Sequence, residues 1–147
     1  MNYTSARMAT RKKFDFMYGR LEVKAILPKG RGIWPAIWML PTDWKYGGWP
    51  RSGEIDVMEH VGFDADTVHG TVHTKSFNHT IGTQVGNQIK SETLYTEYHI
   101  YALEWFEDRI DIYMDDNKYF TFNNSKKGID EWPFDQNFHL LLNLAVG

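Results

Sequence analysis

The sequence predicts an all-β domain, most simply a jelly-roll sandwich of two antiparallel sheets. Three observations indicate this fold class. Apolar and polar residues alternate with a period of two through much of the chain, and amphipathic helical spacing of useful length does not occur. Turn-forming residues separate about eight short strands. The 147 residues can bury one ordinary core, so we expect residues 1–147 to form one domain or part of one.

In the first half, alternation and apolar runs predict strands at 3–10, 18–26, 33–40, 54–61 and 68–74. The segment 18–26 alternates charged and apolar side chains, as a strand with one solvent-facing side does. The Pro-Lys-Gly-Arg-Gly sequence at 28–32 ends it in a turn. Residues 41–53, with Gly, Pro and two Trp, predict a long surface loop of the kind that often carries binding residues.

In the second half, residues 75–93 are polar and predict a loop with one short strand. Strands at 98–106, 109–114 and 118–122 then form a meander with acidic turns between them. An apolar strand is expected at 138–146. The chain begins and ends in strand-like segments, and we expect their pairing partners to lie outside the given sequence, so the sandwich is expected to be incomplete at both ends.

Composition excludes several function classes. The 16 Lys and Arg against 19 Asp and Glu give a net charge of −3, so the strongly basic character of a nucleic-acid-binding domain is missing. The longest apolar stretches are far shorter than the roughly 18 residues that span a bilayer, and the N-terminal residues do not resemble a signal peptide. With no cysteine, disulfides, thiolate metal sites and a cysteine nucleophile are excluded. We therefore expect no nucleic-acid and no membrane partner.

Three acidic residues fall within six positions of the predicted strand 54–61. In a regular strand Glu54 and Asp56 share one face, about 7 Å apart at their Cα atoms, and Glu59 points to the other face. One extra residue at 57–58, a β-bulge, would return Glu59 to the face of the other two, and bulges are frequent beside active sites. We therefore expect three carboxyl groups on one face.

Carboxylates crowded on one face repel one another, so such a cluster retains a proton or binds a cation. Glycoside hydrolysis needs two carboxyl groups in different protonation states. One ionised carboxylate attacks the sugar or stabilises its charge, while a second carboxyl group with a raised pKa protonates the leaving oxygen. The spacing alone leaves three interpretations open: acid–base chemistry, calcium ligation, and a solvated strand face without function.

The hexapeptide at 54–59, Glu-Ile-Asp-Val-Met-Glu, resembles the E-x-D-x-x-E signature of glycoside hydrolase family 16 in its bulged form. Five other segments resemble the laminarinase branch of that family, in family order: YGRLE at 18–22, LPKG at 27–30, GIWPAIWMLP at 32–41, HGTVHT at 69–74 and YALEW at 101–105. The resemblance covers nearly the whole chain. It implies a concanavalin/lectin-like jelly roll, of which this chain looks like the central part.

The resemblance implies a retaining enzyme that cleaves internal β-1,3 linkages of laminarin-like β-glucans. Glu54 would be the nucleophile, Glu59 the acid/base and Asp56 the assisting acid. It implies no cofactor; the complete family domain holds a structural calcium, whose ligands cannot be identified in this chain. It further implies a polysaccharide partner, a monomer when complete, and a secreted, periplasmic or cell-surface location suited to a polymeric substrate.

Two alternative functions stay open. A sandwich with an aromatic-lined cleft can hold sugar without cleaving it, as a lectin-like binding module does, although the intact acid triad favours an enzyme. An agarase- or carrageenase-type galactan hydrolase of the same family would need basic cleft residues for sulfate. The loop 41–53 offers only Lys45 and Arg51, which favours a glucan.

Tryptophan is a second signal, because the apolar face of a pyranose packs on an indole ring. Trp44 and Trp49 lie in the loop before the acids, where they either bind sugar or fold back onto the hydrophobic body. Trp38 and Trp105 alternate with apolar neighbours, and we expect both in the core. By resemblance, Trp34 and Trp49 are cleft residues near the scissile bond.

The same resemblance assigns Arg51 to the cleft and places His73 beside the catalytic acids, where its imidazole can donate to Asp56 or to substrate. His69 shares a strand face with His73, a spacing that is compatible with a zinc pair. Because no cysteine, third histidine in a matching neighbourhood or H-E-x-x-H helix accompanies them, we expect His69 to be a hydrogen-bonded structural residue and assign no metal ligands.

Overall fold

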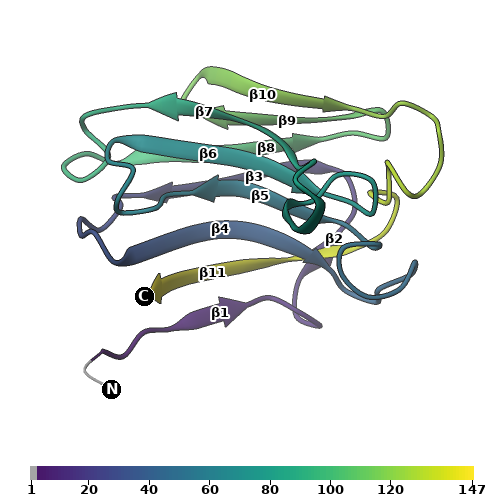
Figure 1. The fold of residues 1–147 in the computed structure, drawn as a ribbon, viewed down its shortest axis with the longest axis horizontal. Helices are drawn as coiled ribbons and strands as arrows, with labels where there is room; N and C mark the ends of the chain where they lie inside the picture. The colour runs from purple at the N-terminus through teal and green to yellow at the C-terminus, as the bar shows by residue number, and fades with distance from the viewer. Residues whose placement is uncertain (1–2) are drawn as a thin grey trace.

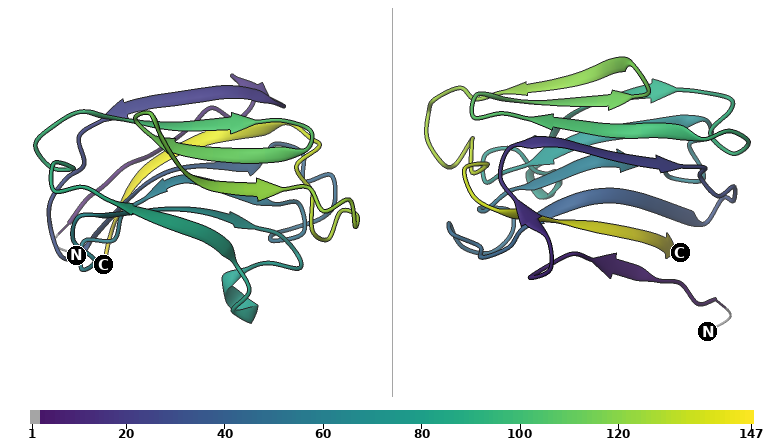
Figure 2. Two further views of the ribbon diagram at one scale, coloured as in Figure 1. Left: turned by 90° about the horizontal axis from the view of Figure 1, so that it is seen from above. Right: turned by 180° about the vertical axis from the view of Figure 1, so that it is seen from behind.

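The computed structural model describes residues 3–147 and confirms the all-β prediction. Two antiparallel sheets pack face to face (Figures 1 and 2). The larger sheet has the strand order β1-β11-β4-β5-β6-β7, with β2 also paired to β11, and the smaller sheet has the order β10-β9-β8-β3. The elements are β1 (Arg7–Ala9), β2 (Asp15–Phe16), β3 (Gly19–Ala25), β4 (Ile33–Pro41), β5 (Glu54–Glu59), β6 (Thr67–His73), the 3-10 helix η1 (His79–Ile81), β7 (Val85–Lys90), β8 (His99–Trp105), β9 (Arg109–Met114), β10 (Asn117–Asn123) and β11 (Phe138–Val146).

The hydrophobic core lies between the two sheets. Strand alternation sends one set of side chains from each sheet into this layer, and most of the large ones are fully buried. Each such side chain contributes about 1.5–3 kcal/mol relative to an exposed position. The opposite face of the larger sheet is therefore free for polar residues. The fully buried side chains include Met39, Ile55, Met58, Tyr101, Leu103, Trp105, Ile110 and Ile112.

The two end segments differ from the expectation. We expected their pairing partners outside the given sequence, but β1 pairs with β11 in antiparallel register, and β11 also pairs with β4 along all nine of its residues. Strand β11 therefore lies inside the larger sheet, and β1 forms its edge (Figure 1). Pairing between distant segments is not encoded in local alternation, so the sequence could not reveal it.

The remaining elements follow the prediction closely. Residues 42–53 contain no strand, as expected for the long loop, and β7 is the short strand expected within 75–93. The two-residue strand β2 and the helix η1 were not predicted, because neither is long enough to show a period. Within residues 3–147, the structure contains no helix long and apolar enough to cross a membrane.

Candidate active site

A β-bulge in β5 places the three acids on one face. Asp56 pairs with Thr71 on β6 and Glu59 pairs with His69, so three steps along β5 match two steps along β6. The register toward β4 shifts in the same stretch. Glu54, Asp56 and Glu59 consequently line one cavity of about 670 Å³. The predicted bulge and the predicted common face are both confirmed.

The side chains of β5 that point away from the cavity anchor the strand in the core. Ile55, Val57 and Met58 are all buried in the core between the sheets. Gly53, immediately before the first acid, has a φ of +88°, and a Cβ there would lie 2.9 Å from Phe134 and Pro133 side-chain atoms. Because both the backbone conformation and the space require glycine, Gly53 fixes the point at which the acidic strand begins.

The cavity lies on the outer face of the larger sheet and crosses several strands. The cavity-lining residues come from β4, β5, β6, β11, η1 and the connections around them, and in the described chain they include no Lys or Arg. They are Trp34, Ala36, Trp38, Glu54, Asp56, Glu59, Val61, Phe63, Asp64, His69, Thr71, His73, His79, Gln84, Asn143 and Ala145.

Burial raises the pKa of all three acids. The pKa of Glu54 rises from 4.5 to about 8, first through burial and second through the charge of Asp56. Burial and then the charge of Glu59 raise the pKa of Asp56 well above 3.8. Burial also raises the pKa of Glu59, and a hydrogen bond from Trp34 opposes this. The cluster therefore retains at least one proton at neutral pH, as general acid chemistry requires.

His73 lies beside the acids, as the resemblance implied. Its Nε2 is 3.2 Å from Asp56 Oδ2 and 3.9 Å from Glu54 Oε1. Burial lowers the pKa of His73, so at neutral pH the imidazole is uncharged and these contacts are not full ion pairs. The contact does not have hydrogen-bond geometry, and Asp56 Oδ2 is buried without a hydrogen-bond partner among the described residues, so the imidazole lies against Asp56 without donating to it.

The residues at the acids offer a poor calcium site. The ligand atoms of Glu54, Asp56 and His73 lie within 4.8 Å of one another, and no other such group of three occurs within residues 3–147. Calcium takes six to eight oxygen ligands, whereas this group includes a nitrogen and sits where the carboxyl groups hold protons. Calcium ligation, which the spacing of the acids had left open, therefore does not fit these residues.

Trp34 contacts Glu59 directly. Its Nε1–H donates to Glu59 Oε1 at 3.0 Å, and the side chain is 47% exposed at the start of β4. Trp49 lies at the other end of the acidic strand, half-buried, with its ring centre 4.9 Å from that of His79 and 6.0 Å from that of His73. The two tryptophans thus lie near opposite ends of the row of acids.

The structure does not bring Arg51 to the acids. Arg51 is exposed on the 42–53 loop and is not among the cavity-lining residues. The next residue, Ser52, is buried and turns inward, where its hydroxyl donates to Gly47 O and accepts from Tyr46 N–H. Because neighbouring side chains of this turn point in different directions, Arg51 faces solvent.

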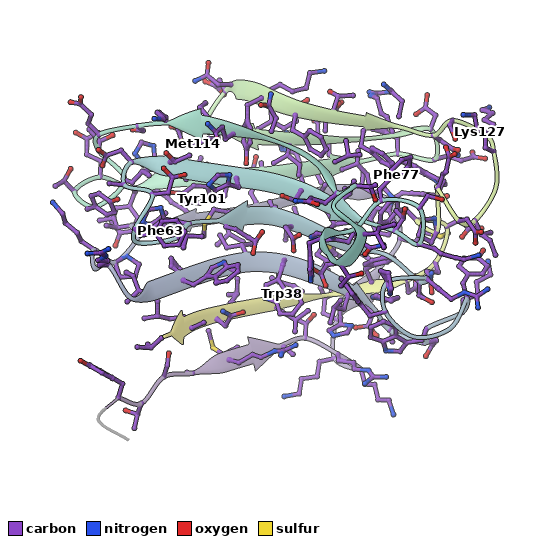
Figure 3. The ribbon with its side chains drawn as sticks, in the orientation of Figure 1. Trp38, Phe63, Phe77, Tyr101, Met114 and Lys127 are labelled. Carbon is purple, nitrogen blue, oxygen red and sulfur yellow. The ribbon has the colours of Figure 1, made fainter. Side chains whose placement is uncertain are left out.

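Trp38 was expected in the core, and this is wrong, whereas Trp105 is fully buried as expected. Trp38 lies on the cavity face with Trp34 and Ala36, and its Nε1–H donates to Asn143 Oδ1 at 2.7 Å. Figure 3 labels it on β4. The sequence could have indicated this position, because residues two apart on a strand share a face.

Several cavity residues were missed by sequence reasoning or left without a role. His79 comes from η1 and stacks near Trp49, and no local pattern marked it. His69 Nε2 contacts Asp64 Oδ2 at 3.1 Å, so the expected hydrogen-bonded histidine is confirmed, although it also lines the cavity. Phe63 follows the acidic strand and was not singled out, because a lone phenylalanine in a connection carries no periodic signal.

The raised pKa of Glu54 predicts a pH-dependent stabilisation in Glu54→Gln. Folding raises this pKa from 4.5 to about 8, so the group destabilises the native state increasingly as pH rises from 4.5 toward 8. We expect the free energy of unfolding of the variant to exceed that of the wild type by on the order of 2–4 kcal/mol at pH 8.5 and to equal it near pH 4. Denaturant unfolding at both pH values measures this, and equal differences at both would contradict it.

Comparison with known proteins agrees with this geometry. The family model "Glycosyl hydrolases family 16" matches residues 1–147. A beta-glucanase of Rhodothermus marinus is 54% identical over 99% of this chain and 53% of its own length, and a beta-1,3-glucan-binding protein of Penaeus monodon is 38% identical over 98% and 46%. The X-ray structure of the laminarinase from Rhodothermus marinus has a TM-score of 0.94 and 51% identity, covering 96% of this chain and 59% of that one.

The chain thus spans about half the length of the curated relatives it matches. The family model nonetheless extends over all 147 residues, and the two-sheet fold matches that of the Rhodothermus laminarinase. The chain belongs to glycoside hydrolase family 16.

Proposed function

We propose that this chain carries the catalytic centre of a retaining glycoside hydrolase that cleaves internal β-1,3 linkages of a laminarin-like β-glucan. The observation that carries the proposal is the row of Glu54, Asp56 and Glu59, with raised pKa values, on the floor of an open cavity. The printed names of the relatives, a beta-glucanase, a laminarinase and a beta-1,3-glucan-binding protein, support the substrate class. Because such a polymer is external to the cell, we also propose a secreted or surface location.

The reaction depends on which carboxyl groups of the cluster are protonated and which are ionised. Glu54 attacks the anomeric carbon as a carboxylate, which requires that Glu54 be ionised while Asp56 retains a proton. Protonated Glu59 gives its proton to the leaving sugar oxygen, and the bond to that oxygen breaks. Glu59, now ionised, takes a proton from water as the water attacks the glycosyl-enzyme, which frees Glu54 and restores the acid.

The shape of the site suits internal linkages. A second hollow shares His69, Thr71 and Gln84 with the main cavity and continues to residues of β7, including Asn87 and Gln88. A groove that continues across the sheet past the acids can admit a chain on both sides of the cleaved bond. The test is incubation with laminarin, with detection of new reducing ends, product lengths and the anomeric configuration of the first product by NMR.

Two results would redirect the proposal. Tight binding of laminarin without new reducing ends would favour the binding module, the function named for the Penaeus relative. Cleavage of a galactan in preference to β-glucan would favour the agarase- or carrageenase-type alternative. The absence of Lys and Arg among the described cavity-lining residues argues against a sulfated substrate.

Trp49→Ala is expected to weaken substrate binding more than folding. The half-buried ring lies beside His73 and His79, which line the cavity, so its exposed part can stack on a sugar while little core area is lost. We expect KM on laminarin to rise about 3–10-fold, the effect of one aromatic contact, with Tm nearly unchanged. Steady-state kinetics and thermal unfolding measure both, with Trp44→Ala from the same loop as the control. A large fall in Tm would instead assign Trp49 to the core.

A further inference from the structure

Phe63 is the most exposed large apolar side chain of the described residues, at 74%. It also lines the cavity that contains the three acids. It lies in the connection from β5 to β6, just beyond Glu59 in the sequence, and is labelled in Figure 3. Trp34, which lines the same cavity, is also exposed. Isolated exposed apolar residues are common on protein surfaces, so exposure alone assigns no role. Its position in the substrate cavity distinguishes this side chain.

The turn that carries Phe63 is firmly built. Gly62 N–H donates to Ile33 O at 2.9 Å, and Asp64 N–H donates to Val61 O at 2.8 Å. A Cβ on Gly62 would lie 1.7 Å from Gly30 O, so the turn packs tightly against the 28–32 turn, and only glycine permits this approach.

The residue after Phe63 is also held by its side chain. Asp64 accepts from Thr67 Oγ1 at 3.2 Å and contacts His69 Nε2 at 3.1 Å. The backbone on both sides of Phe63 is therefore fixed by neighbours, while the ring itself is left uncovered. An aromatic ring presented on a preorganised turn binds a flat apolar partner at low entropic cost.

We propose that Phe63 forms an aromatic platform for an additional sugar unit of the substrate, at the Glu59 end of the cleft. The proposal rests on the proposed function for its ligand, a β-glucan, and adds a residue that contributes affinity for long chains. A pyranose offers an apolar face of axial C–H groups that packs on such a ring. We expect a short substrate held at the acids to end before this turn and a longer chain to extend to it.

The test compares long and short substrates. Phe63→Ala should raise KM on laminarin about 3–10-fold and leave kcat/KM on an aryl β-laminaribioside unchanged. Phe63→Tyr should retain wild-type values because it keeps the ring, and Phe63→Leu should resemble alanine. The matched control is Tyr98→Ala, which removes an aromatic side chain of similar exposure, 65%, outside the cavity. Equal effects of Phe63→Ala on both substrates, or no effect on laminarin, would contradict the proposed platform.

A second measurement separates this proposal from the proposed function. In native gels containing laminarin, the wild-type chain and Tyr98→Ala should be retarded, and Phe63→Ala should be retarded less. If the wild type is retarded but cleaves nothing, the proposed hydrolysis is wrong. The retardation of Phe63→Ala relative to the wild type still tests the proposed platform. If the wild type is neither retarded nor active, both proposals are wrong.

Discussion

Glu54→Ala is expected to abolish hydrolysis of both laminarin and an aryl β-laminaribioside with a nitrophenolate leaving group. Without the carboxylate that forms the glycosyl-enzyme, neither substrate can enter the first step, and an easily displaced leaving group gives no rescue. We expect losses on the order of 10⁴-fold or more on both substrates, as for other nucleophile deletions. Steady-state rates and stopped-flow release of nitrophenolate, which should show no burst, measure this.

A small anion provides the control for Glu54→Ala. Azide can enter the space left by the missing carboxyl group, attack the anomeric carbon and displace nitrophenolate, giving a glycosyl azide of inverted configuration. The loss cannot be ascribed to unfolding, because removing a buried carboxyl with a pKa of about 8 should not destabilise the protein at neutral pH through its charge. A burst from Glu54→Ala without azide would contradict the assignment of the nucleophile.

Local features of the site could be predicted from the sequence. Strand parity and a single bulge are properties of consecutive residues, so the hexapeptide at 54–59 sufficed to place three carboxyl groups on one face. The same argument applied to Trp34 would have placed Trp38 on the cavity face. The expectation of a core position followed hydrophobicity instead, which fails where a sugar-binding cleft is itself lined by aromatic rings.

Features that depend on distant segments could not be predicted. The position of β11 between β1 and β4 depends on pairings more than 90 residues apart in sequence, which local alternation does not encode. The distribution of pKa values also requires the structure. We expected one ionised and one protonated carboxyl group, but burial raises the pKa of all three acids, with a value of about 8 at Glu54. A raised pKa at all three positions therefore differs from the expected division between one ionised and one protonated carboxyl group.

Glu59→Ala is expected to reduce activity on the two substrates unequally, whereas Glu54→Ala is expected to abolish activity on both. Deleting the general acid should lower kcat/KM on laminarin about 10²–10⁴-fold, because a departing sugar alkoxide must be protonated. Nitrophenolate leaves without a proton, so glycosylation by an aryl β-laminaribioside should survive. Hydrolysis of the intermediate then lacks its base and becomes the slow step, which should appear as a burst of nitrophenolate equal to the enzyme concentration.

Trp34 gives a matched control for the Glu59 experiment. Its indole N–H holds Glu59 at 3.0 Å and lowers the pKa of that carboxyl, so Trp34→Phe should keep the acid and raise its pKa. The basic limb of the kcat/KM profile on laminarin should then move to higher pH, with no burst on the aryl substrate, because base and nucleophile both remain. Equal losses of Glu59→Ala on the two substrates would show that Glu59 is not the proton donor. Because kcat/KM reports the pKa values of the free enzyme, a Trp34→Phe profile identical to the wild type would show that the hydrogen bond from Trp34 does not set the pKa of Glu59.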